Sequence, residues 1–474
     1  MSPNDSLPTA EQMVPWCAKL IGADPRFQPL SLQQYLAGIP RLESLSDVPA
    51  ATPVLVRGDL DAKPGEKVGK GDERLRSMLQ TLEFGRKRGW KQILFGHIGR
   101  RPEGSLAAVG KRLEELLGAP VPLLEDWYDE SVMAIADGVD ETIARMPSGG
   151  FLLLENTRKY DIECALWEAG PGDLAKLSEP LARFASQFAE KVARVYVHEA
   201  LSAGSLDSSS TVVPAAMDRV ALGAYAAGEF DGPMLRCLAT RMVVFSGLKI
   251  DKLDDLEAMI GRGTIRLVFA AGSLAMALKK AAAELEGGDF GLGLAEDPAN
   301  SGKDFFISPE RIEQARRMLS SGREKGIEFV LPVDFVLADG TVSESIGPGR
   351  QQFDVGPRTR ELFARKVDDF IAAHGGVKER PAVVFHNGVF GWFEKPAYEA
   401  GTKSFMEQLR RLTAAGCEVY VGGGEGGKAL SLYGKPEWVT HTFTAGGTVL
   451  NALGNKPVPY LLALHMAANR SATK

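Results

Sequence analysis

The stretch TPVLVRGDL (residues 52–60) opens with a short apolar run and ends in a polar turn. It is followed by ERLRSMLQTLEFGRKRG (73–89), whose apolar residues recur at helical spacing, and then by a second apolar run, KQILFGHIGR (91–100). Strands that are buried on both faces are continuous apolar runs, and parallel neighbours are joined by a crossover that is usually a helix. The three segments therefore predict a strand–helix–strand unit of a parallel sheet.

The same alternation continues along the chain. A helix is expected at 105–118, which starts on a serine and stops on a glycine, and further strands are expected at 150–158 and 192–200. The apolar runs of the second half are 241–249, 265–273, 327–338, 381–388 and 417–425. The chain has 474 residues, which is too many for one ordinary core. We predict an α/β protein with two Rossmann-like domains, each built on a mainly parallel sheet.

The domain boundary is placed near residues 228–240, where a Gly- and Pro-containing segment separates the two series of strands. We assign residues 1–232 to an N-terminal domain and 233–455 to a C-terminal domain, and expect the tail, 456–474, to pack back on the first domain. The first ~45 residues lack strong periodicity and are expected to form a surface extension.

Composition indicates an ordinary globular protein, with 45% hydrophobic and 24% charged residues. The 55 basic and 61 acidic side chains leave a formal net charge of −6, which does not favour a nucleic-acid or anionic-membrane partner. The four cysteines form no CxxC pair, and neither a signal peptide nor an apolar run long enough to span a membrane is recognised. We expect a cytoplasmic monomer without disulfides.

Ligands of open parallel sheets bind outside the carboxyl ends of the strands. In the first half, the residues after the strand ends or at the start of the following helix are Asp59, Asp61, Arg74, His97, Arg100 and Arg158. In the second half they are Lys249, Gly272, Asn387 and a glycine run. Arginine clusters suit a small anionic substrate, whereas a glycine loop before a helix suits a nucleotide phosphate.

The glycine run GGGEGGKA (422–429) matches two motifs incompletely. It is close to a P-loop, but Ala429 stands where the Mg²⁺-binding Ser or Thr belongs. It also fits G-x-G-x-x-G, without the acidic residue about 20 positions later that dinucleotide binding requires. A plain tight turn between strand and helix is the third interpretation. The context supports phosphate contact by backbone amides.

From about residue 50 onward, the chain resembles phosphoglycerate kinase in a series of segments that keep the family's order. They are VLVRGDLD (54–61), GDERLR (71–76), GHIGRRPEGSLAAVGKRLEELLG (96–118), LLLENTRKY (152–160), LPVDFVLAD (331–339), FDVGPRTRELF (353–363), HNGVFGWFE (386–394), VGGGEGG (421–427) and HTFTAGGTVLNALGNKPVP (441–459). The resemblance implies a bilobal, hinge-closing kinase whose N-terminal lobe binds 3-phosphoglycerate and whose C-terminal lobe binds Mg-ATP. It implies reversible phosphoryl transfer between ATP and a carboxylate, with an acyl phosphate as the product and Mg²⁺ and ATP/ADP as cofactors.

The resemblance also implies roles for single residues. Catalytic roles fall on Arg74, Lys249 and Lys252. Substrate binding falls on Asp59, Asp61, Arg74, His97, Arg100 and Arg158, of which His97, Arg100 and Arg158 match a clamp for the distal phosphate. Nucleotide binding falls on Lys249, Lys252, Gly272, Asn387, Glu394, Gly423, Gly424, Glu425 and Gly426. Glu425 is in addition the expected metal ligand.

The chain departs from the family pattern at positions with related functions. Leu206 replaces an arginine of the phosphate clamp, and Asp61 replaces an asparagine. Glu425 replaces the metal-binding aspartate, and Lys252 follows Lys249 by three positions where the family has four. The predicted function is ATP-dependent phosphoryl transfer to 3-phosphoglycerate or a related small acid. The departures favour a different acid, one with a smaller, differently charged or amino-bearing distal group. The alternatives are a catalytically impaired relative that binds a nucleotide or a partner protein as a regulator and, less favoured, an NAD-dependent enzyme.

Overall fold

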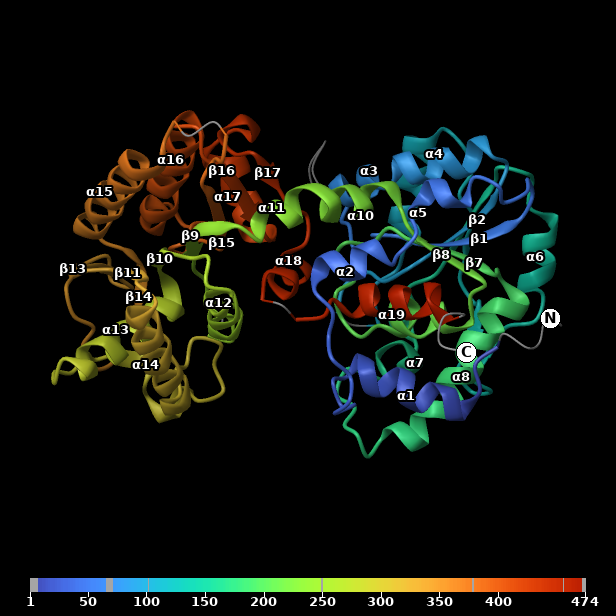
Figure 1. Ribbon diagram of the computed structural model, residues 1–474, viewed down its shortest axis with the longest axis horizontal. Coiled ribbons are helices and arrows are strands. Elements are labelled where there is room, and N and C mark those ends of the chain that lie inside the picture. Colours follow the sequence, from blue (N-terminus) through green and yellow to red (C-terminus); the bar gives the residue numbers. More distant parts are fainter. Residues whose placement is uncertain are drawn as a thin grey trace. The chain divides into compact units, whose positions relative to one another are not determined.

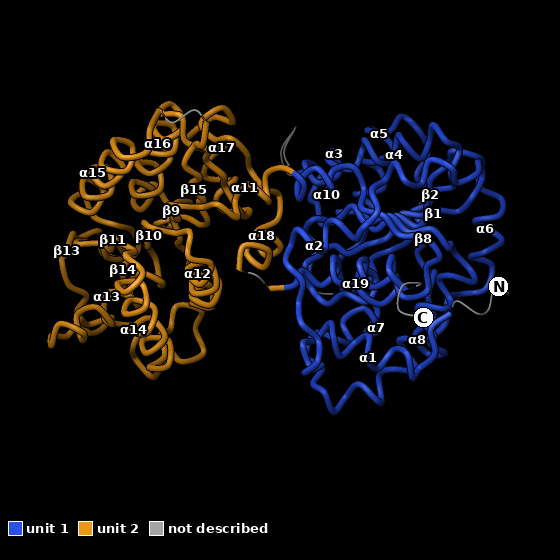
Figure 2. Tube along the Cα trace, viewed as in Figure 1, with its two compact units in different colours: residues 1–231, 457–474 blue, residues 232–456 orange. Residues whose placement is uncertain are grey.

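The computed structural model describes residues 7–64, 71–100, 102–248, 250–376, 379–454 and 456–470. The chain folds as two units, shown in Figure 2. Unit 1 consists of residues 1–231 and 457–474, and unit 2 of residues 232–456. Unit 2 is therefore inserted into unit 1, to which the chain returns with its last residues.

The sheet of unit 1 forms from the apolar runs that predicted it. Its strands are β1 (Pro53–Arg57), β2 (Lys91–Phe95), β3 (Leu123–Leu124), β6 (Phe151–Leu154), β7 (Val195–His198) and β8 (Arg219–Leu222). They lie in the order β3-β6-β2-β1-β7-β8, and all their pairings are parallel. A separate antiparallel pair joins β4 (Tyr128–Asp129) and β5 (Ala134–Ile135). Residues 54–57 of β1 are buried, as expected for a central strand covered on both faces.

The helices of unit 1 lie on both faces of this sheet. They are α1 (Ala10–Leu20), α2 (Leu32–Ala37), α3 (Glu73–Ser77), α4 (Leu79–Lys87), α5 (Ala107–Leu117), α6 (Val139–Arg145), α7 (Asp161–Cys164), α8 (Leu174–Lys191), α9 (Ser208–Thr211), α10 (Ala224–Glu229) and α19 (Pro459–Ala468). Figure 1 shows α3, α4, α5 and α10 on one side, and α1, α7, α8 and α19 on the other.

The N-terminal segment, expected as a surface extension from its weak periodicity, contains α1 and α2. Each helix begins with a capping box, formed by Thr9 with Gln12 in α1 and by Ser31 with Gln34 in α2. Such boxes satisfy amides that the first helical turn leaves unpaired, so they stabilise short helices despite weak periodicity. α1 packs against α8 and is part of the layer that covers the sheet.

Unit 2 repeats the architecture. Its parallel strands are β9 (Thr240–Phe245), β10 (Leu267–Ala270), β11 (Glu328–Val330), β15 (Val383–Asn387), β16 (Glu418–Gly422) and β17 (His441–Thr442). They lie in the order β11-β10-β9-β15-β16-β17. A small antiparallel sheet has the strands β12 (Phe335–Leu337), β13 (Val342–Ser343) and β14 (Gln352–Val355).

One predicted strand of unit 2 is wrong. The run 327–338 is not a single strand but divides into β11 and β12, which belong to different sheets. Pro332 lies between them, and a proline has no backbone N–H with which to continue a ladder.

The helices of unit 2 also form two layers. They are α11 (Leu235–Cys237), α12 (Lys252–Gly261), α13 (Gly272–Leu285), α14 (Pro309–Glu324), α15 (Pro357–His374), α16 (Ala400–Ala414), α17 (Gly424–Tyr433) and α18 (Gly446–Leu453). In Figure 1, α15, α16 and α17 lie on one side of the sheet, and α12, α13 and α14 on the other. The α/β fold with two mainly parallel sheets is thus confirmed.

Both sheets change the direction of their connections at one point. In unit 1 the chain adds β2 on one side of β1 and β7 on the other; in unit 2 it adds β10 on one side of β9 and β15 on the other. Loops diverge at such switch points and leave a crevice at the carboxyl ends of the strands.

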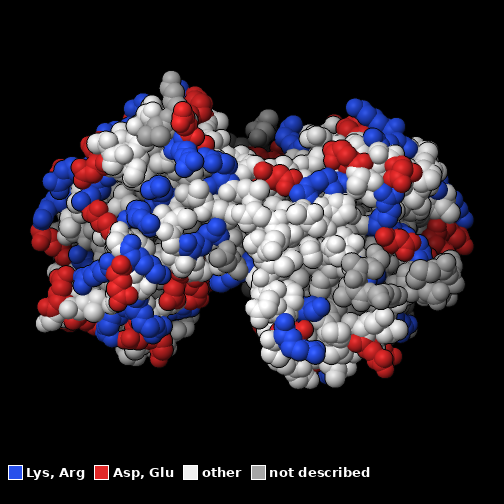
Figure 3. Space-filling view, viewed as in Figure 1, with Lys and Arg blue, Asp and Glu red and all other residues white. Residues whose placement is uncertain are grey.

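On the face of the molecule in Figure 3, both signs of charge are interspersed over unit 2, and the area of unit 1 over α2 carries few charges. No helix within the described ranges is long and apolar enough to cross a membrane.

Candidate functional site

Asp61 and Arg74 form an ion pair at the carboxyl end of β1. Nη1 of Arg74 donates to the backbone oxygen of Asp61 at 2.8 Å and to its Oδ2 at 2.9 Å. Oδ1 of Asp61 accepts a hydrogen bond from the amide of Gly99 at 2.9 Å. Burial raises the pKa of Asp61, but the hydrogen bond from the Gly99 amide and the positive charge of Arg74 outweigh it, so the pKa lies below its ordinary value. Asp61 is therefore an ionised partner that orients Arg74.

Asp59 lies beneath this pair and is almost fully buried. The hydroxyl of Ser202 donates to its Oδ1 at 2.6 Å, and Nε of Arg74 lies 3.8 Å from the same oxygen. The side chain of Arg74 keeps 26% of its surface exposed. Two carboxylates thus fix an arginine that solvent, and hence a small molecule, can still reach.

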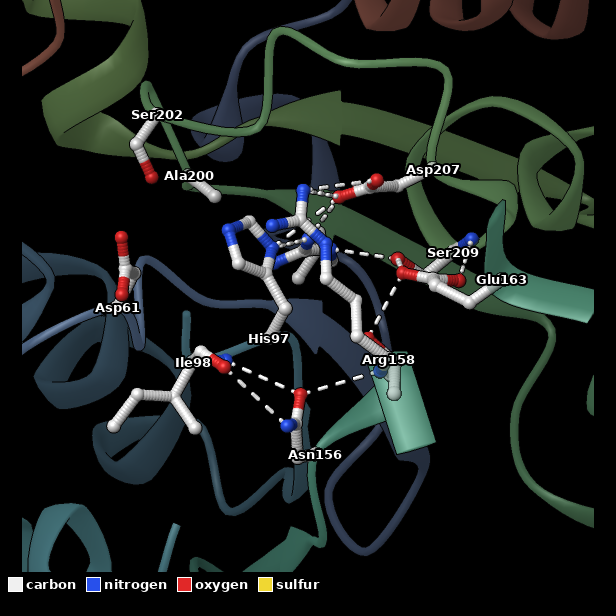
Figure 4. A network of polar contacts seen from close by, with 12 residues as sticks. Asp61, His97, Ile98, Asn156, Arg158, Glu163, Ala200, Ser202, Asp207 and Ser209 are labelled. Atoms are coloured by element: carbon white, nitrogen blue, oxygen red, sulfur yellow. Dashed lines mark hydrogen bonds and ion pairs between the residues drawn. The ribbon is translucent and has the colours of Figure 1, made fainter. Parts of the chain in front are cut away.

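The second group of predicted residues surrounds a carboxylate that sequence analysis missed (Figure 4). Asp207 follows β7 and is fully buried. Nη2 of Arg158 donates to both of its oxygens, at 3.1 and 3.0 Å, and Nη2 of Arg57 lies 3.3 Å from Oδ2. Nδ1 of His97 is 3.2 Å from the same oxygen, and the indole N–H of Trp167 donates to Oδ1 at 3.0 Å. We call Arg57, His97 and Arg158 the basic cluster.

The remaining donors of the basic cluster are also bound. Arg57 directs Nε to the hydroxyl of Ser209 and Nη1 to the backbone oxygen of Gly58, both at 2.9 Å. Nη1 of Arg158 donates to the backbone oxygen of Gly99 at 2.7 Å. Among the described residues, Nε of Arg158 is the one nitrogen of these two guanidinium groups with no hydrogen-bond partner.

Electrostatics of the cluster follow from its burial. Burial lowers the pKa of His97, and the charge of Arg57 lowers it further against the opposing effect of Asp207. Burial alone would raise the pKa of Asp207, but the contacts with His97, Arg158 and Arg57 bring it far below its ordinary value. Burial and then the charge of Asp207 raise the pKa of nearby Glu163 to about 7. Asp207 is therefore the permanent negative charge of the cluster.

Acidification is expected to destabilise the protein through Asp207. Its pKa is lower in the folded than in the unfolded chain, so its contribution is complete above the unfolded value of 3.8 and is lost as the pH falls below it. Urea unfolding at successive pH values below about 5 should give a steeper loss of stability in the wild type than in Asp207→Asn. The comparison reports Asp207 together with the effect of its charge on the pKa values of His97 and Glu163. Asp137→Asn, at a fully exposed carboxylate, should leave the slope unchanged; equal slopes in all three proteins would contradict the assignment.

Arg100 is placed differently from the other predicted residues of unit 1. It is exposed beside Gly99 and makes no hydrogen bond or ion pair with any residue that the structure describes. Asn156 fixes the loop before it, since its side chain accepts from the amide of Ile98 at 3.2 Å and donates to the oxygen of Gly104 at 2.8 Å. Arg100 thus extends from a held loop as a cation available to a ligand.

Unit 2 contains a cavity of about 410 Å³ at the carboxyl ends of its strands. Its walls include the apolar side chains of Met276, Leu292, Phe305 and Ile346. Of the predicted nucleotide-binding residues, those that line it are Gly272, Glu394 and Glu425. An apolar pocket with a few polar groups at its edge is typical of a site for a small organic ligand such as a nucleotide base.

The amino end of α17 lies at this cavity, because Glu425 in its first turn is part of the wall. Gly423 caps the helix with φ +87, a left-handed conformation that favours glycine, and Gly424 is the first helical residue. The first amides of a helix have no partner within it, and together with the helix dipole they attract phosphate. Gly426 is buried in the same turn.

The other predicted residues of unit 2 support the loops. Asn387 ends β15 and donates to the oxygen of Gly422 at 3.1 Å, and Lys252 begins α12 and donates to the oxygen of Ser246 at 2.9 Å. Glu394 accepts from Lys428 at 3.2 Å across the mouth of the cavity. Lys249 lies outside the described residues.

A magnesium ion fits Glu425 only together with a nucleotide. No group of three or more His, Cys, Asp or Glu side chains able to hold a metal occurs in the described part of the chain. Mg²⁺ in nucleotide sites keeps water and phosphate oxygens and needs only one or two carboxylates. The single carboxylate of Glu425 beside an amide-rich helix end meets that requirement.

Asp207, Ser202, Trp167 and Glu163 complete the site of unit 1 and were not recognised from the sequence. Asp207 and Ser202 could have been predicted, because both follow β7. The rule that ligand-binding residues follow the ends of strands applies to β7 as well. Trp167 and Glu163 lie in and after the short helix α7, where no such rule applies.

Comparison with known proteins agrees with this architecture. The model of the family described as phosphoglycerate kinase matches residues 46–456. The cytosolic phosphoglycerate kinase of Triticum aestivum is 27% identical over 430 residues, which cover 87% of this chain and 95% of that protein. The phosphoglycerate kinase of Clostridium beijerinckii is 28% identical over 425 residues, with coverage of 87% and 95%.

Solved structures show the same fold. Phosphoglycerate kinase from Pyrococcus horikoshii OT3 has a TM-score of 0.68 at 21% identity, and the Coxiella burnetii protein has 0.63 at 22%; each comparison covers 90% of this chain and 99% of the other. At such identities the likeness concerns the fold, while the family match extends over most of the sequence. The chain belongs to the phosphoglycerate kinase family.

Proposed function

We propose that the protein is an ATP-dependent phosphotransferase that converts a small carboxylic acid into an acyl phosphate. The kinase class follows from the family, and the acceptor and the residue roles are our proposal. The observation that carries it is the cavity of unit 2, in which apolar walls meet the amino end of α17 and Glu425. This arrangement suits a nucleotide whose base enters the cavity and whose phosphates reach the helix amides.

Unit 1 supplies the acceptor side of the proposal. Arg74 is partly exposed and is oriented by Asp59 and Asp61, and Arg100 is a second accessible cation nearby. Guanidinium groups bind carboxylates in a planar, two-point geometry. Phosphoryl transfer depends mainly on positioning and on neutralising charge, so an arginine held in this manner is suited to the reacting carboxylate. When bound, Mg²⁺ would neutralise charge on the transferring phosphates.

The test is ATP turnover with a panel of small carboxylic acids, in which hydroxylamine traps the acyl phosphate as a hydroxamate. ADP and hydroxamate should form together and only when both Mg-ATP and an accepted acid are present. Mg-ATP alone should raise the melting temperature progressively with the logarithm of its concentration above the Kd, and NAD should not. Stabilisation by NAD instead of Mg-ATP would overturn the proposal.

A catalytically silent nucleotide-binding protein is the second candidate. The observation that favours it is the internal pairing of Arg74 with Asp61 and of Lys428 with Glu394, which occupies charged groups near both ligand regions. Stabilisation by Mg-ATP without turnover of any acid in the panel would select this candidate.

The Glu425→Gln variant is expected to raise the KM for Mg-ATP by roughly 10- to 100-fold, because it removes a charged metal ligand while keeping the side-chain size. Initial rates at varied Mg-ATP concentration measure this effect. Glu437→Gln is the matched control, since Glu437 is exposed in the segment that follows α17. An unchanged KM in Glu425→Gln would exclude Glu425 as the metal ligand.

A further inference from the structure

The basic cluster of unit 1 contains an anion of its own. Asp207 is fully buried and lies beside Arg158 and His97 (Figure 4). It receives hydrogen bonds from Arg158 and Trp167, and its Oδ2 is in contact with Arg57 and His97. A carboxylate in this position occupies the place that an external anion would need in order to reach these residues. Because the cluster faces the loop of Gly99, it is adjacent to the pair formed by Arg74 and Asp61.

We propose that Asp207 permanently fills the basic cluster, so that the acceptor acid bound beside Arg74 carries no phosphate or other second anion at its far end. This inference rests on the proposed function and names the substrate class of the same site. The acceptor is a small carboxylic acid whose other polar group is a hydrogen-bond donor, either a hydroxyl or an ammonium group.

Nearly every nitrogen of the two guanidinium groups in the basic cluster already has a partner within the protein. Arg57 uses Nε, Nη1 and Nη2 on groups of the protein, and Arg158 uses both terminal nitrogens. A phosphate needs several donors directed at its oxygens, and charge-assisted hydrogen bonds of this kind provide much of its affinity. Apart from the buried Nε of Arg158, these guanidinium groups have no nitrogen without a partner in the described part of the protein.

Asp207 also reduces the positive charge that the cluster can offer to a second anion. Arg57 and Arg158 bring two positive charges, and the carboxylate of Asp207 neutralises one of them. The buried carboxyl of Glu163 is close by, because it accepts a hydrogen bond from the amide of Ser209, whose hydroxyl binds Arg57. A dianionic phosphate would have to displace Asp207 from its partners. Otherwise it would approach the negative charge of Asp207 in a buried site, where water does not screen the repulsion between the two charges. Removing the partner of a buried charge is costly because the charge remains desolvated, so Asp207 resists displacement.

The surroundings of Arg74 define what the site accepts. Asp59 and Asp61 present carboxylate oxygens and Ser202 a hydroxyl, all close to the arginine. Carboxylates accept hydrogen bonds but repel anions, so they favour a hydroxyl or ammonium group on the acceptor. In the reaction, an oxygen of the acceptor carboxylate attacks the γ-phosphorus and the bond from that phosphorus to the ADP oxygen breaks. The products are an acyl phosphate and ADP, and nothing is oxidised or reduced.

Binding of free anions tests the inference without turnover. With Mg-ADP present at saturation, so that the amino end of α17 is occupied and no phosphoryl transfer occurs, inorganic phosphate and 3-phosphoglycerate should leave the melting temperature of the wild type unchanged up to about 10 mM, whereas both should stabilise Asp207→Asn. The apparent affinity of the variant for phosphate should exceed that of the wild type by roughly 10- to 150-fold, the value of one charge-assisted partner. Stabilisation of the wild type by either anion at lower concentration would overturn the inference, whether or not the variant folds.

Turnover separates this inference from the proposed function. Glycerate with 3-phosphoglycerate and serine with phosphoserine are matched pairs that differ only in the distal phosphate. The unphosphorylated member of at least one pair should give the higher kcat/KM in the hydroxamate assay, and a higher value for the phosphorylated member of both pairs would refute the inference. If no acid reacts at all, the proposed function fails, and the phosphate titrations still decide whether Asp207 fills the cluster.

Discussion

Replacing Arg74 with alanine is expected to lower kcat for acyl phosphate formation by roughly 100- to 1,000-fold, the usual effect of removing one charged or donor group that stabilises a transition state. The side chain is held by Asp59 and Asp61 and still has 26% of its surface exposed. Its charge would lie between the reacting carboxylate and the transferring phosphoryl group, where positioning determines the rate.

Two further variants separate the charge of Arg74 from the geometry of its guanidinium group. Arg74→Lys keeps the charge without the planar fork and should fall between alanine and the wild type. Arg145→Ala, in the same unit, removes an arginine whose side chain is 80% exposed and should have the activity of the wild type. The KM for Mg-ATP should stay within about threefold in Arg74→Ala, since the residue belongs to the acceptor side. A kcat within about threefold of the wild type would remove Arg74 from the mechanism.

The Gly388→Ala substitution is expected to destabilise unit 2 by about 3–5 kcal/mol, the sum of left-handed backbone strain and severe overpacking. Gly388 follows β15 with φ +99, and a Cβ atom there would lie 1.9 Å from the backbone oxygen of Ser246. Since Ser246 follows β9, the substitution would force apart the two strands at which the connections of this sheet change direction.

Urea unfolding measures this effect, and a second glycine provides the control. Gly263 has φ +80, but no atom of the described residues would lie within 4 Å of a Cβ atom added there, so Gly263→Ala isolates the strain and should cost only about 1–2 kcal/mol. An equal loss of unfolding free energy in Gly388→Ala and Gly263→Ala would mean that the close approach of Gly388 to Ser246 does not add to the destabilisation. Nucleotide affinity should fall with Gly388→Ala alone, because Gly247, which follows Ser246, lines the cavity.

Local patterns were sufficient for the sheets but not for every segment. Apolar runs such as 54–56 and 242–245 predicted β1 and β9 because a strand covered on both faces has no polar side to obscure the signal. The run 327–338 was wrongly predicted as one strand, because periodicity cannot show that the chain leaves one sheet for another at Pro332. The capping boxes of α1 and α2 were visible in the sequence, but periodicity was given more weight than end signals.

The candidate site divides in the same manner. Arg74, His97 and Arg158 were predicted because they lie after strand ends or at the start of the following helix and match family segments, and the structure brings His97 and Arg158 together at Asp207. The role of Asp207 was not found, since its contact with His97 joins residues 110 positions apart and depends on how two loops meet in space. Leu206 was recognised as standing where the family has an arginine. The next residue, Asp207, was not recognised as the carboxylate that contacts all three residues of the basic cluster.

The return of the chain to unit 1 after residue 456 has a consequence for biosynthesis. α19 buries Tyr460, Leu461, Leu462 and Leu464, yet it is translated after the whole of unit 2. Unit 2 is one continuous segment and can complete its core while the C-terminal end is still inside the ribosome, whereas unit 1, although translated first, must wait for its final helix. During that interval the nascent protein exposes the apolar surface that α19 covers, so unit 1, although translated first, is the unit whose core is completed later.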